Sequence, residues 1–137
     1  MHVPDSLESP HKGHSGLRRL INAFFYSLSG LALAFRYESA FRQEIALAAV
    51  LIPVACLLPV GAVERVLLIA SVLLVLIVEL LNSSLEAAID RISLDTHLLS
   101  KRAKDLGSAA VFLALTALAV TWLLLAGPAL LRLAGMP

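Results

Sequence analysis

The chain has 137 residues, of which 59% are hydrophobic and 15% are charged, and its formal net charge is +1. A soluble domain of this size rarely has the interior volume to bury so much apolar surface, so the composition argues against a small soluble protein. It predicts an integral membrane protein instead. A single cysteine, Cys56, excludes an internal disulfide bond.

The first 36 residues predict a tail followed by a surface helix. Residues 1–15 contain prolines, histidines and a glycine but no continuous apolar run. This composition predicts a disordered tail and gives no sign of a cleavable signal peptide. Residues 16–36 carry apolar side chains at helical spacing, with Arg18 and Arg19 near the start. A helix of this kind is typical of the membrane interface, where we expect it to lie.

Three apolar runs predict three transmembrane helices, at residues 40–60, 63–91 and 105–126. A tight turn at residues 59–61 joins the first two helices, and a polar connection at residues 92–104 joins the second to the third. The expected fold class is therefore all-α and membrane-integral, with one interfacial amphipathic helix and three transmembrane helices in a bundle. Residues 16–127 are expected to form a single domain.

The end of the third helix carries two further expectations. Trp122 lies near its far end, where an aromatic ring commonly anchors a helix at the membrane interface. Gly127 and Pro128 are expected to break the helix, because proline lacks the N–H that the helix needs. Residues 128–137 would then form a short C-terminal tail.

Basic residues predict the orientation of the chain in the membrane. Most of them precede the first transmembrane helix or lie between the second and the third, whereas only Arg65 and Arg132 fall on the other side. Cytoplasmic loops carry an excess of Lys and Arg, so we expect a cytoplasmic N-terminus and an outside C-terminus. Most of the acidic residues then gather near the cytoplasmic face, where ATP and Mg²⁺ are available.

The second transmembrane helix ends in a polar stripe. Offsets of three, seven and eleven residues from Glu79 place Asn82, Glu86 and Asp90 within roughly 80° of one another at about 100° per residue. Ser83 belongs to the same stripe. Ionisable residues in a membrane helix are costly, so such a stripe indicates a functional site. Glu79 precedes Glu86 by seven residues and would lie about 10 Å deeper along the helix.

The stripe suggests phosphoryl transfer. Glu38 and Glu86 could hold Mg²⁺ together with phosphate oxygens, Glu79 could act as general base for a lipid hydroxyl, and Lys104 could offset phosphate charge. The chain has neither a GxxxxGK[ST] loop nor a GxGxxG loop, so a nucleotide site would be built from helix ends and side chains. The residues alone leave a structural alternative open, in which the acids are solvated or fix helix packing by pairing with Arg91, Arg102 and Lys104.

Three stretches resemble the prokaryotic diacylglycerol kinase family. They are VELLNSSLEAAIDR at residues 78–91, LSKRAKDLGSAAV at residues 99–111 and ESAFRQE at residues 38–44. The resemblance covers residues 18–127 without gaps, and the motifs are long and specific. It implies a homotrimeric kinase of the bacterial inner membrane, with active sites between subunits, that uses MgATP to convert diacylglycerol to phosphatidic acid. No nucleic-acid partner is expected.

The resemblance also implies roles for individual residues. Glu79 matches the general base, Asn82 a residue that positions the transferred phosphate, and Glu38 and Glu86 the metal ligands. The positions that match nucleotide contacts are Arg19, Tyr26, Asp95, Thr96, His97, Lys104 and Asp105. The positions that match the lipid and phosphate region are Arg42, Gln43, Glu44 and Ser108.

Two alternatives remain beside the diacylglycerol kinase interpretation. Undecaprenol kinases belong to the same family and would use the same catalytic residues on a polyprenol. A membrane protein without catalytic activity, such as an accessory subunit, would have no need to keep Glu38, Glu79, Asn82, Glu86 and Lys104 together. Failure to bind MgATP would favour the membrane protein without catalytic activity over a kinase.

Overall fold

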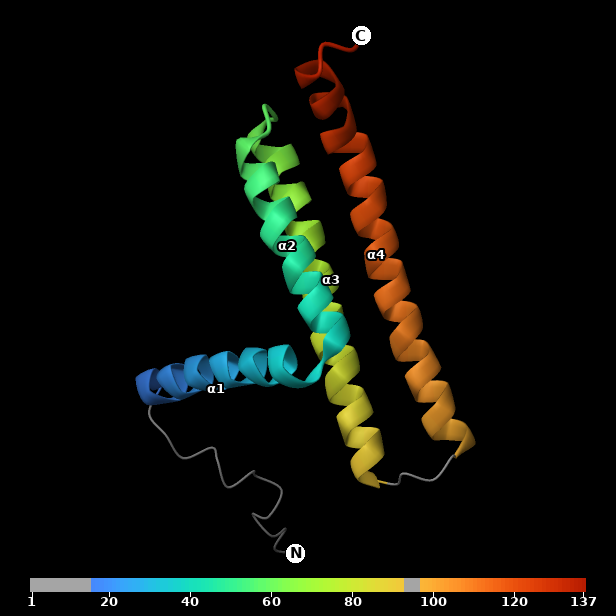
Figure 1. The fold of residues 1–137 in the computed structure, drawn as a ribbon. Helices are drawn as coiled ribbons and strands as arrows, with labels where there is room; N and C mark the ends of the chain where they lie inside the picture. Colours follow the sequence, from blue (N-terminus) through green and yellow to red (C-terminus); the bar gives the residue numbers. More distant parts are fainter. Residues whose placement is uncertain (1–15, 93–96) are drawn as a thin grey trace, which may run out of the picture. The chain divides into compact units, whose positions relative to one another are not determined.

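A computed structural model describes residues 16–92 and 97–137, and the described elements are all helices. They are α1 (Gly16–Tyr37), α2 (Ser39–Leu57), α3 (Ala62–Ile92) and α4 (Leu98–Leu133) (Figure 1). The chain divides into two compact units, with the boundary inside α1 between Leu33 and Ala34. The tail expected at residues 1–15 lies outside the described residues.

The first unit, as far as it is described, consists of the larger part of α1. Its apolar side chains are largely exposed, and Leu17, for example, has 71% of its surface accessible. Phe24 and Phe25 pack edge to face, with 5.9 Å between their ring centroids. The helix predicted for residues 16–36 is therefore confirmed, ending one residue later than expected.

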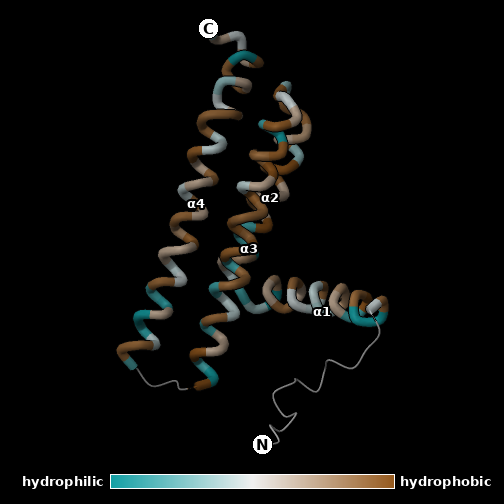
Figure 2. The backbone as a smooth tube through the Cα atoms, turned by 180° about the vertical axis from the view of Figure 1, so that it is seen from behind, coloured by the Kyte–Doolittle hydropathy of each residue, from teal (hydrophilic) through white to brown (hydrophobic). Residues whose placement is uncertain are grey.

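The second unit contains three helices that are long and apolar enough to cross a membrane, α2, α3 and α4. They lie side by side, and α3 packs against both α2 and α4 (Figures 1 and 2). The prediction of three membrane-spanning helices is confirmed. Polar residues gather where α3 ends and α4 begins, whereas the middle of α4 is apolar (Figure 2).

Small side chains allow the three helices to pack closely. One buried cluster joins Ala48 of α2 to residues of α3 and α4; its other members are Val72, Val75, Ala114 and Leu118. A second cluster lies nearer the α2–α3 turn and contains Ala55, Leu58, Leu68, Ala126 and Ala129. In a membrane, helices associate through such close packing rather than through the hydrophobic effect.

Trp122 has a different role from the one expected. Its side chain is half-buried and packs against both apolar clusters. Its indole Nε1 donates a hydrogen bond of 3.2 Å to the backbone carbonyl of Leu68 on α3. Trp122 therefore joins α4 to α3 inside the bundle, whereas the sequence pattern indicated a ring at the membrane interface.

Helix α4 is longer at both ends than the sequence pattern indicates. The break expected at Gly127 and Pro128 is wrong, because α4 continues through both residues to Leu133. Ala126 and Ala129 are buried on either side of Pro128, and this packing offsets the hydrogen bond that proline cannot donate. At the other end, the helix begins at Leu98, inside the region expected to be a polar connection.

Arg65 closes the turn between α2 and α3. Its guanidinium donates hydrogen bonds to the carbonyl oxygens of Ala55, Leu58 and Val60, at 3.1, 3.1 and 3.3 Å. The last carbonyls of a helix have no partner within the helix, and in an apolar environment each would be costly to leave unpaired. The half-buried Arg65 therefore satisfies the end of α2 with a side chain from α3.

Candidate active site

One face of α3 carries the polar residues that the sequence pattern groups together. Glu79 is buried, with 6% of its surface exposed, whereas Asn82 and Glu86 are half-buried and Asp90 is exposed. Asn82 Nδ2 donates a hydrogen bond of 3.3 Å to Glu86 Oε1. The helical spacing thus places a buried carboxyl group, an amide and two more accessible carboxylates along one line.

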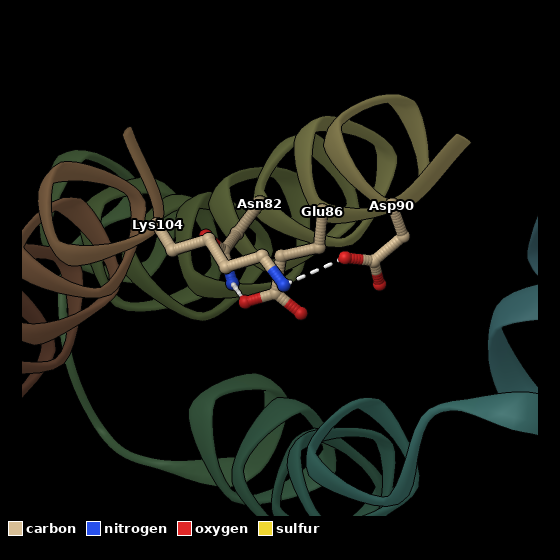
Figure 3. A network of polar contacts seen from close by, with 4 residues as sticks. All are labelled: Asn82, Glu86, Asp90 and Lys104. Carbon is tan, nitrogen blue, oxygen red and sulfur yellow. Dashed lines mark hydrogen bonds and ion pairs between the residues drawn. The ribbon is translucent and has the colours of Figure 1, made fainter. Parts of the chain in front are cut away.

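The start of α4 adds a positive charge to this face. Lys104 Nζ donates to Asp90 Oδ1 across the two helices at 2.7 Å, beside the Asn82–Glu86 pair (Figure 3). The structural alternative predicted a pairing of acids with Arg91, Arg102 or Lys104, and Lys104 makes it. The Lys104 side chain also lies beside the Glu86 carboxylate (Figure 3).

The start of α2 contributes two further carboxylates. Glu38 immediately precedes α2 and is half-buried, and its side chain does not cap the helix. Glu44 is also half-buried, and its Oε2 is buried without a hydrogen-bond partner. Glu38 and Glu44 therefore add two half-buried carboxylates at the start of α2 to the acids of α3.

The acids fit a hard divalent cation that brings its own further ligands. Within the described residues no group of three or more His, Cys, Asp or Glu side chains could enclose a metal ion. Mg²⁺ commonly binds through one or two carboxylates together with phosphate oxygens and waters. The pair Glu38 and Glu86 suits that mode, since the Glu38 carboxylate is not used as a helix cap and Glu86 accepts from Asn82 through only one oxygen.

Other residues implied by the resemblance have local partners in the structure. Arg42 Nη1 donates to the carbonyl oxygens of Phe35 and Arg36 at 3.1 Å each, so it caps the C-terminal end of α1. Asp105 pairs with Lys101 at 2.7 Å on the exposed surface of α4. His97 is the N-cap of α4, and its Nδ1 accepts from the backbone N–H of Leu99. Gln43 and Ser108 are exposed on α2 and α4.

The remaining residues that match nucleotide contacts of the family fall into two groups. Arg19 and Tyr26 lie on α1 in the first unit, and both side chains are exposed. Asp95 and Thr96 lie outside the described residues. The described site therefore rests on α3, the start of α4 and the start of α2.

Asp90 is the residue whose role was missed. The sequence pattern placed it on the polar stripe but gave it no part in the chemistry. Its offset of four residues from Glu86 is the available signal, because residues four apart lie on the same face of a helix. The partner of Asp90 becomes apparent only in three dimensions, since Lys104 follows it by fourteen residues.

Comparison with known proteins identifies the family. The model of the family "Prokaryotic diacylglycerol kinase" matches residues 25–126. A diacylglycerol kinase of Pseudomonas aeruginosa is 61% identical over 114 residues, which cover 83% of this chain and 93% of that protein. Diacylglycerol kinases of Haemophilus influenzae and Escherichia coli K12 are 51% and 50% identical, over 79% and 81% of this chain and 92% and 91% of theirs.

These matches cover the residues that form the site described above. They span α2, α3 and the larger part of α4, with Glu38, Glu79, Asn82, Glu86 and Lys104 inside the matched range. A kinase family leaves no ground for the alternative of a membrane protein without catalytic activity. The chain is an enzyme, a membrane-integral kinase that belongs to the prokaryotic diacylglycerol kinase family.

Proposed function

We propose that this kinase transfers the γ-phosphate of ATP to the hydroxyl group of diacylglycerol and forms phosphatidic acid at the cytoplasmic interface of the bacterial inner membrane. The observation that supports this most strongly is the position of Glu79. It is the only charged residue among the buried residues of the described part of the chain, and it lies on a membrane-spanning helix. A buried carboxylate at that depth meets a substrate that arrives through the bilayer.

The proposed reaction is a direct transfer. The diacylglycerol hydroxyl gives its proton to the Glu79 carboxylate, and its oxygen forms a bond to the γ-phosphorus of ATP. The bond between that phosphorus and the bridging oxygen of ADP breaks, and ADP leaves. No covalent enzyme intermediate is involved, and Glu79 later returns its proton to solvent.

The other residues of the site bind and orient the phosphates. Mg²⁺ bound with ATP would neutralise phosphate charge, with Glu38 and Glu86 as its protein ligands. Asn82 positions the transferred group through its amide, and Lys104 offsets charge that develops on the phosphates. The lipid and phosphate region includes Arg42, Gln43, Glu44 and Ser108. We place Arg19, Tyr26, Asp95, Thr96, His97 and Asp105 at the nucleotide.

The assembly is proposed as a homotrimer with sites between neighbouring subunits. Many large apolar side chains of the three membrane helices remain exposed in the single chain, Leu57, Phe112 and Leu123 among them. Lipid and neighbouring subunits would cover these surfaces. The N-terminus is placed in the cytoplasm and the C-terminus outside, on the distribution of basic residues.

Phosphate transfer from labelled ATP in mixed micelles tests this function. The purified protein would be given diacylglycerol and undecaprenol side by side, with Mg²⁺ and with a chelator. We expect phosphatidic acid to form only with Mg²⁺ and polyprenyl phosphate to form much more slowly. Preferential phosphorylation of undecaprenol would assign the chain to the polyprenol substrate. Transfer at the full rate in the presence of chelator would contradict the role of the metal.

A further inference from the structure

Helices α3 and α4 approach each other closely at Gly107 and Asn82. Gly107 lies on α4, about one turn after Lys104, and is half-buried against α3. A Cβ atom added at Gly107 would overlap Oδ1 of Asn82, and it would lie only 3.2 Å from Cγ of the same side chain. The next nearest atom is Leu85 Cδ2, at an ordinary packing distance of 3.5 Å. The missing side chain at position 107 thus leaves room for the Asn82 amide.

The Asn82 amide has one defined orientation in this space. Its Nδ2 donates to Glu86 Oε1, and its Oδ1 is buried toward Gly107 without a hydrogen-bond partner. The reverse orientation would turn Oδ1 toward the Glu86 carboxylate, which accepts hydrogen bonds and would repel another acceptor when ionised. Glu86 therefore selects the direction of the amide, and Gly107 leaves the volume that this direction needs.

We propose that Gly107 is a positioning residue, which holds the Asn82 amide in line with Glu86 because position 107 has no side chain. This inference rests on the proposed function, in which Asn82 positions the transferred phosphate. An added methyl group would meet the end of the Asn82 side chain rather than the backbone of α3. The side chain can rotate away at low cost, so the methyl group would displace the amide while leaving the helix packing in place.

The test uses the two asparagines of the chain, Asn22 and Asn82. Labelling with ¹⁵N-asparagine gives two side-chain NH₂ signals, of which Asn22 on α1 serves as an internal reference. We expect Gly107→Ala to shift the Asn82 signal and to leave the Asn22 signal unchanged. The matched control is Gly127→Ala on the same helix, where an added Cβ would meet nothing within 4 Å. This control should move neither signal.

Kinetics provide the second readout. We expect Gly107→Ala to lower kcat about 10- to 100-fold, the scale of loss that a small misplacement of a catalytic group produces. KM for ATP and for the lipid should stay within about twofold, since the displaced amide acts on the transferred phosphate alone and the other contacts to ATP and lipid are kept. Gly127→Ala should keep the wild-type kcat. A wild-type kcat, or an unshifted Asn82 signal, in Gly107→Ala would overturn the inference.

A double variant covers the case in which Gly107→Ala does not fold. Removal of the Asn82 side chain also removes the overlap, so Gly107→Ala with Asn82→Ala should fold as well as Asn82→Ala alone. If the double variant is unfolded too, the added methyl group conflicts with something other than Asn82, and the inference is wrong. Wild-type activity in Asn82→Ala alone would instead contradict the role that the proposed function gives to Asn82, whereas loss of activity there with normal activity in Gly107→Ala would contradict this inference alone.

Discussion

Asp90 on α3 and Lys104 on α4 form an ion pair of 2.7 Å that joins the last turns of one helix to the first turns of the next. Both side chains are substantially exposed, at 49% and 40%. Exposed ion pairs contribute little stability, typically about 0–1 kcal/mol. We therefore interpret the pair as a means of fixing the Lys104 ammonium beside Glu86 and Asn82 rather than as a source of stability.

Asp90→Asn is expected to separate these two roles. The variant keeps the shape of the side chain but removes its charge, so Lys104 loses the ionised partner that holds it in position. We expect the transfer rate from ATP to fall about 10-fold or more, whereas the free energy of unfolding should change little, because the pair is exposed to solvent. Steady-state kinetics and thermal unfolding in detergent measure the two quantities.

A second ion pair provides the reference for stability. Lys101 and Asp105 are also 2.7 Å apart, and they are more exposed, at 65% and 66%. Lys101→Gln removes that pair, so its effect on thermal unfolding shows what the loss of an exposed ion pair costs. A clearly larger destabilisation in Asp90→Asn would show that the Asp90–Lys104 pair maintains the packing of α3 on α4.

Glu79→Gln is expected to abolish turnover without disturbing assembly. The substitution preserves the size of a buried side chain and removes its capacity to accept the hydroxyl proton. General base catalysis contributes about 10²–10⁴ in rate, so a loss on that scale is expected. Binding of a fluorescent ATP analogue and the mass of the assembly by light scattering should match the wild type.

Glu64→Gln is the matched control for Glu79→Gln. Glu64 lies in the first turn of the same helix, at the end remote from the polar stripe. The same chemical change there should leave turnover near the wild-type level. If Glu79→Gln instead loses its assembly, Glu79 has a structural role and the proposed base must be sought elsewhere.

Trp122→Phe tests the hydrogen bond between α4 and α3. Phenylalanine keeps most of the ring that packs against both apolar clusters but cannot donate to the Leu68 carbonyl. We expect a loss of roughly 0.5–1.5 kcal/mol in the free energy of unfolding, because the carbonyl keeps its helical partner. Unfolding in detergent provides the measurement. Trp122→Ala should cost more, since it also removes the packing.

Arg65→Met is expected to destabilise the turn between α2 and α3. The substitution removes three hydrogen bonds from one guanidinium. A hydrogen bond to a charged group contributes about 1.5–3 kcal/mol. We expect a net loss of about 2–4 kcal/mol, and Arg65→Lys should recover part of it. Arg132→Met, which removes one exposed bond to the Pro128 carbonyl, should have a small effect. Equal effects of the two methionine variants would refute the capping role of Arg65.

The sequence predicted the membrane helices because their signal is local. Apolar runs of the required length are visible without any tertiary information, and α2, α3 and α4 lie where those runs lie. The expectations that proline breaks a helix and that tryptophan lies at the membrane interface were wrong where packing between helices opposes them. Pro128 continues α4 because buried alanines stand on both sides of it, and Trp122 points into the bundle because Leu68 offers an acceptor there.

In the candidate site, too, the sequence predicted what depends on local helical spacing and did not predict what depends on tertiary packing. Helical periodicity alone grouped Glu79, Asn82, Glu86 and Asp90 on one face, as the structure has them. The sequence offered Arg91, Arg102 and Lys104 as partners for the acids without choosing among them, because the choice depends on how α4 lies against α3. The Arg65 cap was not predicted either, since the carbonyl groups it binds exist in every residue and carry no sequence signal.

The length of α4 bears on how the enzyme responds to its lipid surroundings. Its 36 residues extend over roughly 54 Å at 1.5 Å per residue, well beyond the ~30 Å of a hydrocarbon core. Part of this excess is the polar start of the helix, residues 100–105, which can project into water, and tilting or a local change in bilayer thickness can accommodate the rest. Membranes with longer acyl chains would draw the start of α4 toward the hydrocarbon, whereas thinner ones would lift it into water. We therefore expect bilayer thickness to alter the depth at which Lys104 lies in the headgroup region.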